Sequence, residues 1–261
     1  MRIRLLGARK HTYTRRKNMT IVAFDTSTEV CSAALLHDGS IIAERLNSAG
    51  SNHAALLPQY VQELQAIAQE HDRVIEAVAI GDGPGSYTGL RISASLAKGL
   101  CYGLDIPLYA IPTLALIAFS AKSAIQRFED LKIQRLEGLI CPMIDARRME
   151  VYTAIYDEQL HVVEPLSAKI IDEHSFAELL DKYIIYFCGN GAAKCKDVIK
   201  HPNARWIDGI IPTGAQAGLL VENELKGEQI YRKVEGKDIA YYEPNYLKDF
   251  IAAPSHIKGL K

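Results

Sequence analysis

Residues 20–25 read TIVAFD and residues 139–145 read LICPMID, two apolar runs that each end in an aspartate. Short apolar runs of this kind are typical of buried strands. The first run is followed by expected strands at residues 30–37 and 40–47, which are joined by Asp38-Gly39, a dipeptide suited to a two-residue hairpin turn. This part of the chain is therefore predicted to be a β-meander.

The same order of elements occurs twice along the chain. Apolar residues at helical spacing predict a helix over residues 53–71, and a second, rich in small residues, is expected over 90–104. With strands at 77–80 and 107–111, the first half reads βββαβαβ. The second half repeats this order, with strands expected at 139–145, 150–157, 160–168, 184–188 and 204–207 and helices at 173–182 and 192–200.

The two halves also share residues. At an offset of 120 positions, Asp25 meets Asp145, and three further identities follow it: Ala34 with Ala154, Glu44 with Glu164 and Leu46 with Leu166. A duplication predicts two α/β lobes that face each other across a cleft, the layout of the actin, Hsp70 and sugar-kinase superfamily. We expect an N-terminal lobe over residues 19–112 and a C-terminal lobe over 113–261, with a helix near 213–226 and a C-terminal tail.

Composition favours an ordinary globular protein. Of 261 residues, 48% are hydrophobic and 23% charged, which argues against disorder and against a coiled coil. The most apolar stretch, residues 111–121, is too short for a transmembrane helix. Five cysteines without a C-x-x-C pair argue against a disulfide framework and favour a reducing, cytoplasmic compartment.

Charge is distributed unevenly. Residues 1–18 hold seven Arg or Lys and no Asp or Glu, and we interpret them as a disordered extension or a mis-set start. The remainder is acidic, so it is poorly suited to holding a polyanion alone. If nucleic acid is a substrate, a partner is expected to help hold it.

The loops that follow the two aspartates are the first candidates for chemistry. In the superfamily, such strand-ending aspartates flank the phosphates and metal of a nucleotide. Asp25 precedes two hydroxyl residues, Thr26 and Ser27, which suit phosphate oxygens. Asp145 precedes Arg147, a bulky residue in a loop where glycine would allow a phosphate close to the backbone. The alternative is that both aspartates only terminate strands.

A glycine-rich loop at residues 81–89 joins a strand to a helix, a geometry that can bind anions. It does not match G-x-x-x-x-G-K-[ST], and it does not match G-x-G-x-x-G. Ser86 or Thr88 would instead cap the helix that carries Arg91. We therefore favour a capped structural turn over an anion site. The candidate residues here are Gly83, Gly85, Ser86, Thr88 and Arg91, together with His53 at the start of the helix expected over residues 53–71.

Other catalytic constellations are not supported. None of the eight histidines lies three or four residues from another, so no helix presents a metal-binding pair, and Leu57 stands four residues after His53. A G-x-S-x-G nucleophile motif is also absent. We expect no resident metal and no cofactor.

Five segments together resemble the TsaB family, formerly called YeaZ. They are IVAFDTST at residues 21–28, NH at 52–53 with LLP at 56–58, GPGSYTGLRI at 83–92, IDARR at 144–148 with EVY at 150–152, and PNYLK at 244–248. The resemblance runs from Met19 to about Lys248.

The resemblance implies a two-lobed fold and a non-catalytic subunit that pairs with TsaD, with TsaE docking on the pair. TsaD transfers a threonylcarbamoyl group to the adenosine next to the anticodon of ANN-decoding tRNAs and carries the metal-binding histidine pair. Contact with tRNA would then occur only through the complex. The resemblance does not decide whether the isolated chain forms a homodimer. A small-metabolite kinase of the same fold and a metalloprotease are the alternatives, and Arg147 and the histidine spacing respectively argue against them.

The resemblance also implies a partner surface on the two helices of the first lobe. We expect a helical bundle with TsaD, formed by an apolar stripe on the first helix and by small residues on the second. The alternative is that these faces pack on the chain's own sheet. The expected interface residues are Leu57, Tyr60, Val61, Leu64, Ser93, Ala94 and Ala97.

Overall fold

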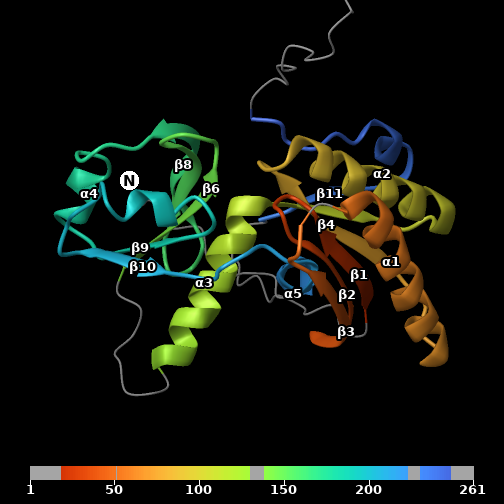
Figure 1. Ribbon diagram of the computed structural model, residues 1–261. Helices are drawn as coiled ribbons and strands as arrows, with labels where there is room; N and C mark the ends of the chain where they lie inside the picture. The colour runs from red at the N-terminus through yellow and green to blue at the C-terminus, as the bar shows by residue number, and fades with distance from the viewer. Residues whose placement is uncertain (1–18, 51, 130–137, 223–229, 248–261) are drawn as a thin grey trace, which may run out of the picture.

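The computed structural model describes residues 19–50, 52–129, 138–222 and 230–247. The interpretations of residues 1–18 and of the C-terminal tail after residue 247 therefore lie outside the described residues. Within the described part of the chain, the strands form two sheets, one to each side of a long central helix (Figure 1).

The first sheet has six strands in the order β11-β5-β4-β1-β2-β3. Asp38 and Gly39, with φ of 49° and 74°, form the predicted hairpin turn between β2 and β3, so the β-meander is confirmed. The strands are β1 (Thr20–Asp25), β2 (Cys31–His37), β3 (Ser40–Asn47), β4 (Ala77–Gly83), β5 (Leu108–Pro112) and β11 (Arg232–Val234).

The second sheet has five strands in the order β10-β9-β6-β7-β8, which repeats the first sheet without β11. In the first sheet, β1 ends in Asp25 and pairs antiparallel with β2 and parallel with β4. In the second sheet, β6 ends in Asp145 and pairs in the same way with β7 and β9. The predicted repeat is therefore confirmed. The strands are β6 (Leu139–Asp145), β7 (Glu150–Tyr156), β8 (Val162–Ile170), β9 (Ile185–Cys188) and β10 (Ala204–Ile207).

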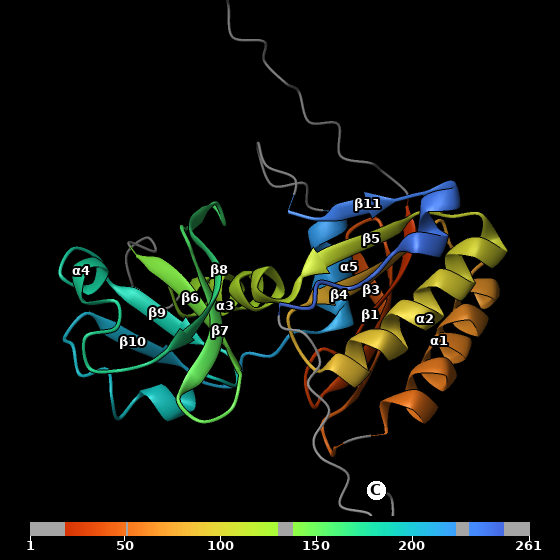
Figure 2. The same cartoon turned by 90° about the horizontal axis from the view of Figure 1, so that it is seen from above.

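The helices on the outer faces differ greatly between the two sheets. The outer face of the first sheet is covered by α1 (His53–Glu70) and α2 (Tyr87–Leu104), which lie side by side (Figure 2). The corresponding segments of the second sheet shrink to α4 (Ala177–Leu180) and a single 3₁₀ turn, η1 (Ala193–Cys195). The expected helices at 173–182 and 192–200 are thus wrong in length. Phe176, at φ 65°, interrupts the first of them, since a positive φ cannot continue a right-handed helix.

A helix that the sequence pattern did not reveal, α3 (Thr113–Glu129), lies between the two sheets (Figure 1). Its apolar residues meet both sheets, so its amino-terminal turns are buried all round and show no polar face that would mark a helical period. None of the helices among the described residues is long and apolar enough to cross a membrane.

The helix expected near 213–226 is present as α5 (Gly214–Glu222), but it packs on the first sheet. A Cβ at Gly214 would lie 2.4 Å from Ala23 O, and one at Gly218 would lie 2.2 Å from the Leu36 side chain, so glycine allows this close approach. The strand β11 and the 3₁₀ helix η2 (Gly236–Tyr241) also return to the first lobe. The assignment of these segments to the second lobe is corrected, while the division at residue 112 stays a prediction.

Candidate functional site

A cavity of about 970 Å³ opens where the two sheets face each other. The loops after β1, β4 and β6, the start of α1 and the loop after β9 all contribute to its lining. Ser27, His53 and Ser86 come from the first lobe, and Asp145 and Asn190 from the second. The duplication therefore brings the carboxyl ends of equivalent strands together, as the sequence predicts.

Asp25 ends β1 and is completely buried. Its Oδ1 accepts hydrogen bonds from the Ser27 amide at 3.0 Å and the Ser27 hydroxyl at 2.8 Å, whereas Oδ2 has no partner among the described residues. A Cβ at Gly81 would lie 1.9 Å from that Oδ2, so the backbone of β4 presses directly on the carboxylate. Burial raises the pKa of Asp25 to about 6, against the hydrogen bonds from Ser27 and the nearby His53.

The two hydroxyl residues after Asp25 are bonded inside the protein. The Thr26 hydroxyl donates to Gly89 O at 2.7 Å, and the Ser27 carbonyl accepts from the Ser86 amide at 2.7 Å. A Cβ at Gly85 would lie 2.3 Å from Ser27 O, so a larger residue would separate these loops. Thr26 and Ser27 therefore hold the loop after β1 against the glycine-rich loop.

The glycine-rich loop is the capped turn that we favoured from the sequence. Ser86 is the N-cap of α2, and its side-chain oxygen accepts a hydrogen bond from the Gly89 amide at 3.2 Å. Upstream, the Gly83 amide donates to the Thr113 hydroxyl at 3.1 Å. Thr88 is exposed and does not cap the helix. Three amides that an anion would need, at residues 83, 86 and 89, are thus already bonded to the protein.

His53 begins α1 at the edge of the cavity. Its Nε2 lies 2.9 Å from Thr28 O, and its buried Nδ1 has no partner among the described residues. Leu57, one turn later, is buried in the apolar core. No group of three or more metal-ligating side chains occurs in the part of the chain that the structure describes.

Asp145 ends β6 but is exposed, with 49% of its side chain accessible. The Lys194 ammonium and the Arg147 amide both donate to its Oδ1, and Lys194 also donates to Glu150 O at 2.7 Å. Although partial burial opposes ionisation, these two donors hold the pKa of Asp145 below its ordinary value. Lys194 therefore occupies the carboxylate oxygen of Asp145 that a metal ion bound to a nucleotide would need as a ligand.

Residues 242–246 supply a part of the site that sequence reasoning did not assign. Asp82 lies near the end of β4, and its side chain accepts hydrogen bonds from the Tyr242 hydroxyl at 2.7 Å and from Arg232 at 3.1 Å. The Asp82 carbonyl accepts from the Asn245 amide at 2.7 Å. Burial raises the pKa of Asp82, although the hydrogen bond from Tyr242 opposes this. The only sequence signal was PNYLK at 244–248, which had no role attached to it.

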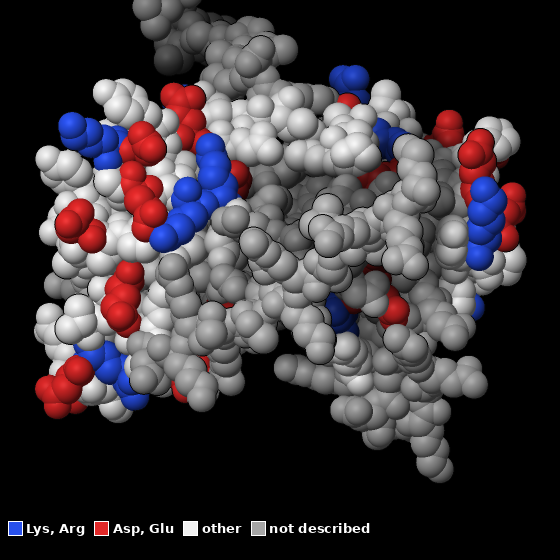
Figure 3. Space-filling view, turned by 180° about the vertical axis from the view of Figure 1, so that it is seen from behind, with Lys and Arg blue, Asp and Glu red and all other residues white. Residues whose placement is uncertain are grey.

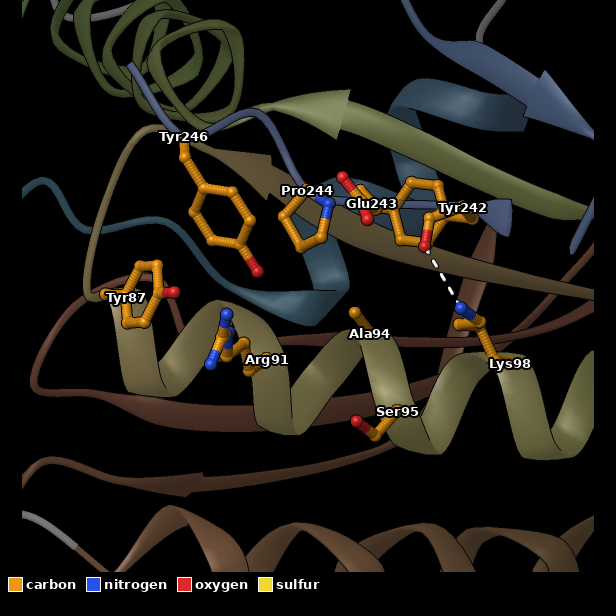
Figure 4. A pocket seen from close by; sticks show the side chains of 9 residues that line it. All are labelled: Tyr87, Arg91, Ala94, Ser95, Lys98, Tyr242, Glu243, Pro244 and Tyr246. Atoms are coloured by element: carbon orange, nitrogen blue, oxygen red, sulfur yellow. Dashed lines mark hydrogen bonds between the residues drawn. The ribbon is translucent and has the colours of Figure 1, made fainter. Parts of the chain in front are cut away.

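The 242–246 segment also forms a second hollow, of about 440 Å³, with one face of α2 (Figure 4). The Arg91 guanidinium lies 4.2 Å from the centre of the Tyr87 ring and 5.9 Å from that of Tyr246. Further along the helix, Lys98 donates to Tyr242 O at 3.2 Å (Figure 4). Arg91, on α2 as the sequence predicted, therefore joins Tyr87 at the start of that helix to the 242–246 segment.

The expected partner-interface residues are mostly inaccessible. Six of the seven are buried against the first sheet or against the facing helix, and Tyr60 is half-buried. Their burial within the chain's own first lobe, the alternative that we considered, accounts for these residues. The buried six are Leu57, Val61, Leu64, Ser93, Ala94 and Ala97.

A different set of residues faces outward between α1 and α2. They form a groove of about 670 Å³ with a mainly apolar lining, which includes Ala54 and Pro58 of α1 and Ile92 and Leu96 of α2. The face of the molecule seen from behind shows acidic and basic side chains mixed together (Figure 3). The described residues visible on that face therefore form no patch of a single charge.

Comparisons with known proteins agree on one family. The model described as TsaD, tRNA N6-adenosine threonylcarbamoyltransferase, matches residues 46–254. The chain is 29% identical to the protein of Bacillus subtilis (strain 168) named tRNA threonylcarbamoyladenosine biosynthesis protein TsaB, over 88% of this chain and 94% of that protein. It is 35% identical to the protein of that name from Haemophilus influenzae, over 52% of this chain and about half (53%) of the relative.

The fold is similar to that of a solved structure, YeaZ from Pseudomonas aeruginosa. The two share 26% identity with a TM-score of 0.67, over 87% of this chain and 99% of that one. The similarity therefore extends over both lobes.

Proposed function

Because the chain belongs to the TsaD family of tRNA N6-adenosine threonylcarbamoyltransferases, we propose that it is the non-catalytic subunit that pairs with TsaD. It takes part in tRNA threonylcarbamoyladenosine biosynthesis, as its relatives named TsaB do. In this proposal TsaD transfers the threonylcarbamoyl group, TsaE docks on the pair, and tRNA is bound by the complex.

The state of the two strand-end aspartates is the observation that carries the proposal. Catalysis in such a cleft needs carboxylates that can reach a metal or a phosphate. Asp25 is fully buried beneath Gly81, and Asp145 is bonded to Lys194. The sequence also lacks the histidine pair, since Leu57 stands one turn after His53. The cleft thus keeps the backbone of a nucleotide site without its reactive groups.

The groove between α1 and α2 is the surface that we assign to TsaD. Two long helices that lie side by side with an apolar groove between them can receive a helix of a partner. The side-chain ridges of the partner helix would fit into this groove. Ile92 and Leu96 are half-buried in the isolated chain and would become fully buried in such a complex.

Complex formation with purified TsaD is the direct test of this surface. Ile92→Arg places a charge in the groove, and we expect it to weaken binding about a hundredfold or more. Tyr102→Arg is the matched control, since Tyr102 lies on the same helix, is 81% exposed and does not line the groove. Wild type and control should elute with TsaD in gel filtration. Binding of TsaD by a folded Ile92→Arg chain would contradict the assignment.

The isolated chain should neither hydrolyse ATP nor modify tRNA. MgATP and tRNA are incubated with the chain alone, and nucleotide products and modified nucleosides are measured. Turnover above the no-protein control that survives a further purification step would contradict the non-catalytic role.

A further inference from the structure

We propose that the loop between β6 and β7 contacts phosphates of single-stranded RNA at the open side of the cleft. The inference rests on the proposed function, because it takes tRNA as the substrate of the complex, and it adds a contact from this subunit. It begins from Arg147 and Arg148, two adjacent arginines that are both exposed. Neither side chain forms a hydrogen bond or an ion pair with another described residue.

Both arginines stand in a backbone conformation that disfavours them. Their φ angles are 73° and 49°, a region that residues with a Cβ seldom adopt. The turn is held there by its own bonds: the Arg147 amide donates to Asp145 at 2.8 Å, and the Glu150 amide donates to Arg147 O at 3.1 Å. Glycine would suit these positions better, so the presence of two arginines here indicates a use for their side chains.

The nearby carboxylate does not cancel this charge. Asp145 is already bonded to Lys194, and Glu29, the other carboxylate that lines the cavity, accepts a hydrogen bond from Asn190 at 3.3 Å. Arginine is well suited to phosphate, since its planar guanidinium donates two parallel hydrogen bonds to an anion. A phosphate backbone that passes over this rim would meet two guanidinium groups free to bind it.

The adjoining cavity fits unpaired nucleotides. Arg147 lines it together with Tyr152 and the tyrosines of the opposite lobe, Tyr87 and Tyr246. A phenol ring such as that of Tyr152 can stack on a base. Asn52 is the N-cap residue of α1, but its side chain makes no capping hydrogen bond, so its amide can bond to a base edge. Recognition of this kind needs unpaired bases, so the ligand that we propose is a loop or a single strand. Free nucleotide is the outcome that the test must separate from this.

The test uses the complex of the full chain with TsaD and a fluorescent anticodon stem-loop RNA. Binding is measured from 50 to 300 mM salt by fluorescence anisotropy, a range in which phosphate contacts show as a salt slope (about 0.7 to 0.9 per contact). In Arg147→Gln/Arg148→Gln we expect affinity at about 100 mM salt to fall roughly tenfold and the slope to drop by about 1.4 to 1.8, the value for two contacts. The matched control is Arg205→Gln, because the exposed Arg205 of β10 bonds only to neighbouring carbonyls among the described residues.

Two further variants keep the outcome unambiguous. Arg147→Gly/Arg148→Gly removes both charges while relieving the positive φ, so it should fold and bind RNA as weakly as the glutamine variant. Arg147→Lys/Arg148→Lys should retain most of the salt slope, since the charge remains. Unchanged RNA affinity in the glutamine and glycine variants would overturn the inference.

The remaining outcomes separate the inference from the function on which it rests. Loss of ATP binding with unchanged RNA binding would assign the arginines to free nucleotide and also overturn it. Gel filtration of each variant with TsaD is run in parallel. Failure of the wild-type chain to bind TsaD would refute the proposed pairing, whereas intact pairing with unchanged RNA binding would refute only the RNA contact.

Discussion

Asp25 and Asp145 end equivalent strands of a duplicated sheet, yet their surroundings differ completely. Asp25 is fully buried, and burial raises its pKa to about 6. Asp145 is exposed, and the Lys194 ammonium, against partial burial, helps to hold its pKa below the ordinary value. The strand order around them is the same. Duplication therefore fixed the backbone positions, while the loops packed over each strand end decided the chemistry.

The difference lies in what covers each strand end. Over Asp25, the glycine-rich loop packs so closely that Cβ atoms at Gly85 or Gly89 would strike the backbone of the loop after β1. The equivalent loop of the second lobe contains Gly189 and Gly191, which press on β6 itself and leave the carboxylate of Asp145 outside. Close packing on the first side gives rigidity, and openness on the second leaves a surface for a ligand.

The largest expected effect comes from filling the space over Asp25. In Gly81→Ala, the new Cβ would lie 1.9 Å from Oδ2 of Asp25 and 3.2 Å from its Cγ, so a buried strand or the carboxylate must move. We expect the free energy of unfolding to fall by about 3 kcal/mol or more. Gly99→Ala is the control, because nothing lies within 4 Å of that Cβ, and it should be neutral or stabilising by about 1 kcal/mol. Urea denaturation of both variants measures the difference, and equal stability would contradict the packing described.

The pH dependence of stability should come from Asp25. Its pKa is about 6 in the folded protein against 3.8 ordinarily, so between these values the folded state holds a proton that the unfolded state has lost. Stability must then fall as pH rises through this window and level off above it. Asp25→Asn removes this dependence, because asparagine does not titrate. The free energy of unfolding of the variant minus that of the wild type should therefore increase by about 1 to 3 kcal/mol between pH 4 and pH 7. A difference that stays flat with pH would show that Asp25 is ionised and well solvated.

The cap on α2 should give a smaller effect. Ser86→Ala removes the side-chain acceptor for the Gly89 amide, and we expect a loss of about 1 kcal/mol. Thr88→Ala, two positions later, serves as the control because Thr88 is exposed and makes no cap. Thermal melts of the pair distinguish the two residues. Equal losses in both variants would mean that the turn is not held by Ser86.

The smallest effect is expected at the open aspartate. Asp145→Asn weakens the bond to Lys194, but both side chains are partly exposed, so water replaces most of the interaction. We expect a change of about 0.5 kcal/mol or less at neutral pH. Because the pKa of Asp145 is lowered, even this contribution should vanish as pH falls below the ordinary range. A loss as large as that of Gly81→Ala would erase the contrast between the two lobes.

Sequence patterns predicted ten of the eleven strands among the described residues, the clearest being β1 and β6, two short apolar runs that end in aspartate. They did not predict β11, whose three residues read RKV. The helices were harder to predict. The central α3 lacks a polar face along its first turns, and the helices of the second lobe lack the length that the repeat suggested. The spacing of apolar residues predicts that a segment is helical, but it does not predict how many turns the helix has before the chain returns to the sheet.

The site shows the same limit. The sequence brought Asp25 and Asp145 to one cleft, but only packing shows that one is buried beneath Gly81 and the other bonded to Lys194, 49 residues away. Apolar and small residues on α1 and α2 were expected to form a partner surface, although periodicity cannot tell whether a stripe meets a partner or its own sheet. Arg232 and Tyr242, which hold Asp82, are likewise joined to it only by the fold.

The role that we propose for this subunit is to assist threonylcarbamoyl transfer without performing it. The most direct measurement supplies TsaD, threonylcarbamoyl-adenylate and tRNA, with and without the chain, and quantifies threonylcarbamoyladenosine by mass spectrometry of the digested RNA. We expect no product from the chain alone, product with TsaD and wild type, and a yield within about twofold of wild type with Asp25→Asn/Asp145→Asn. Product from the chain alone would contradict the claim. So would a loss of about a hundredfold in the double variant, with its fold and its binding to TsaD intact, because the cleft would then perform the chemistry.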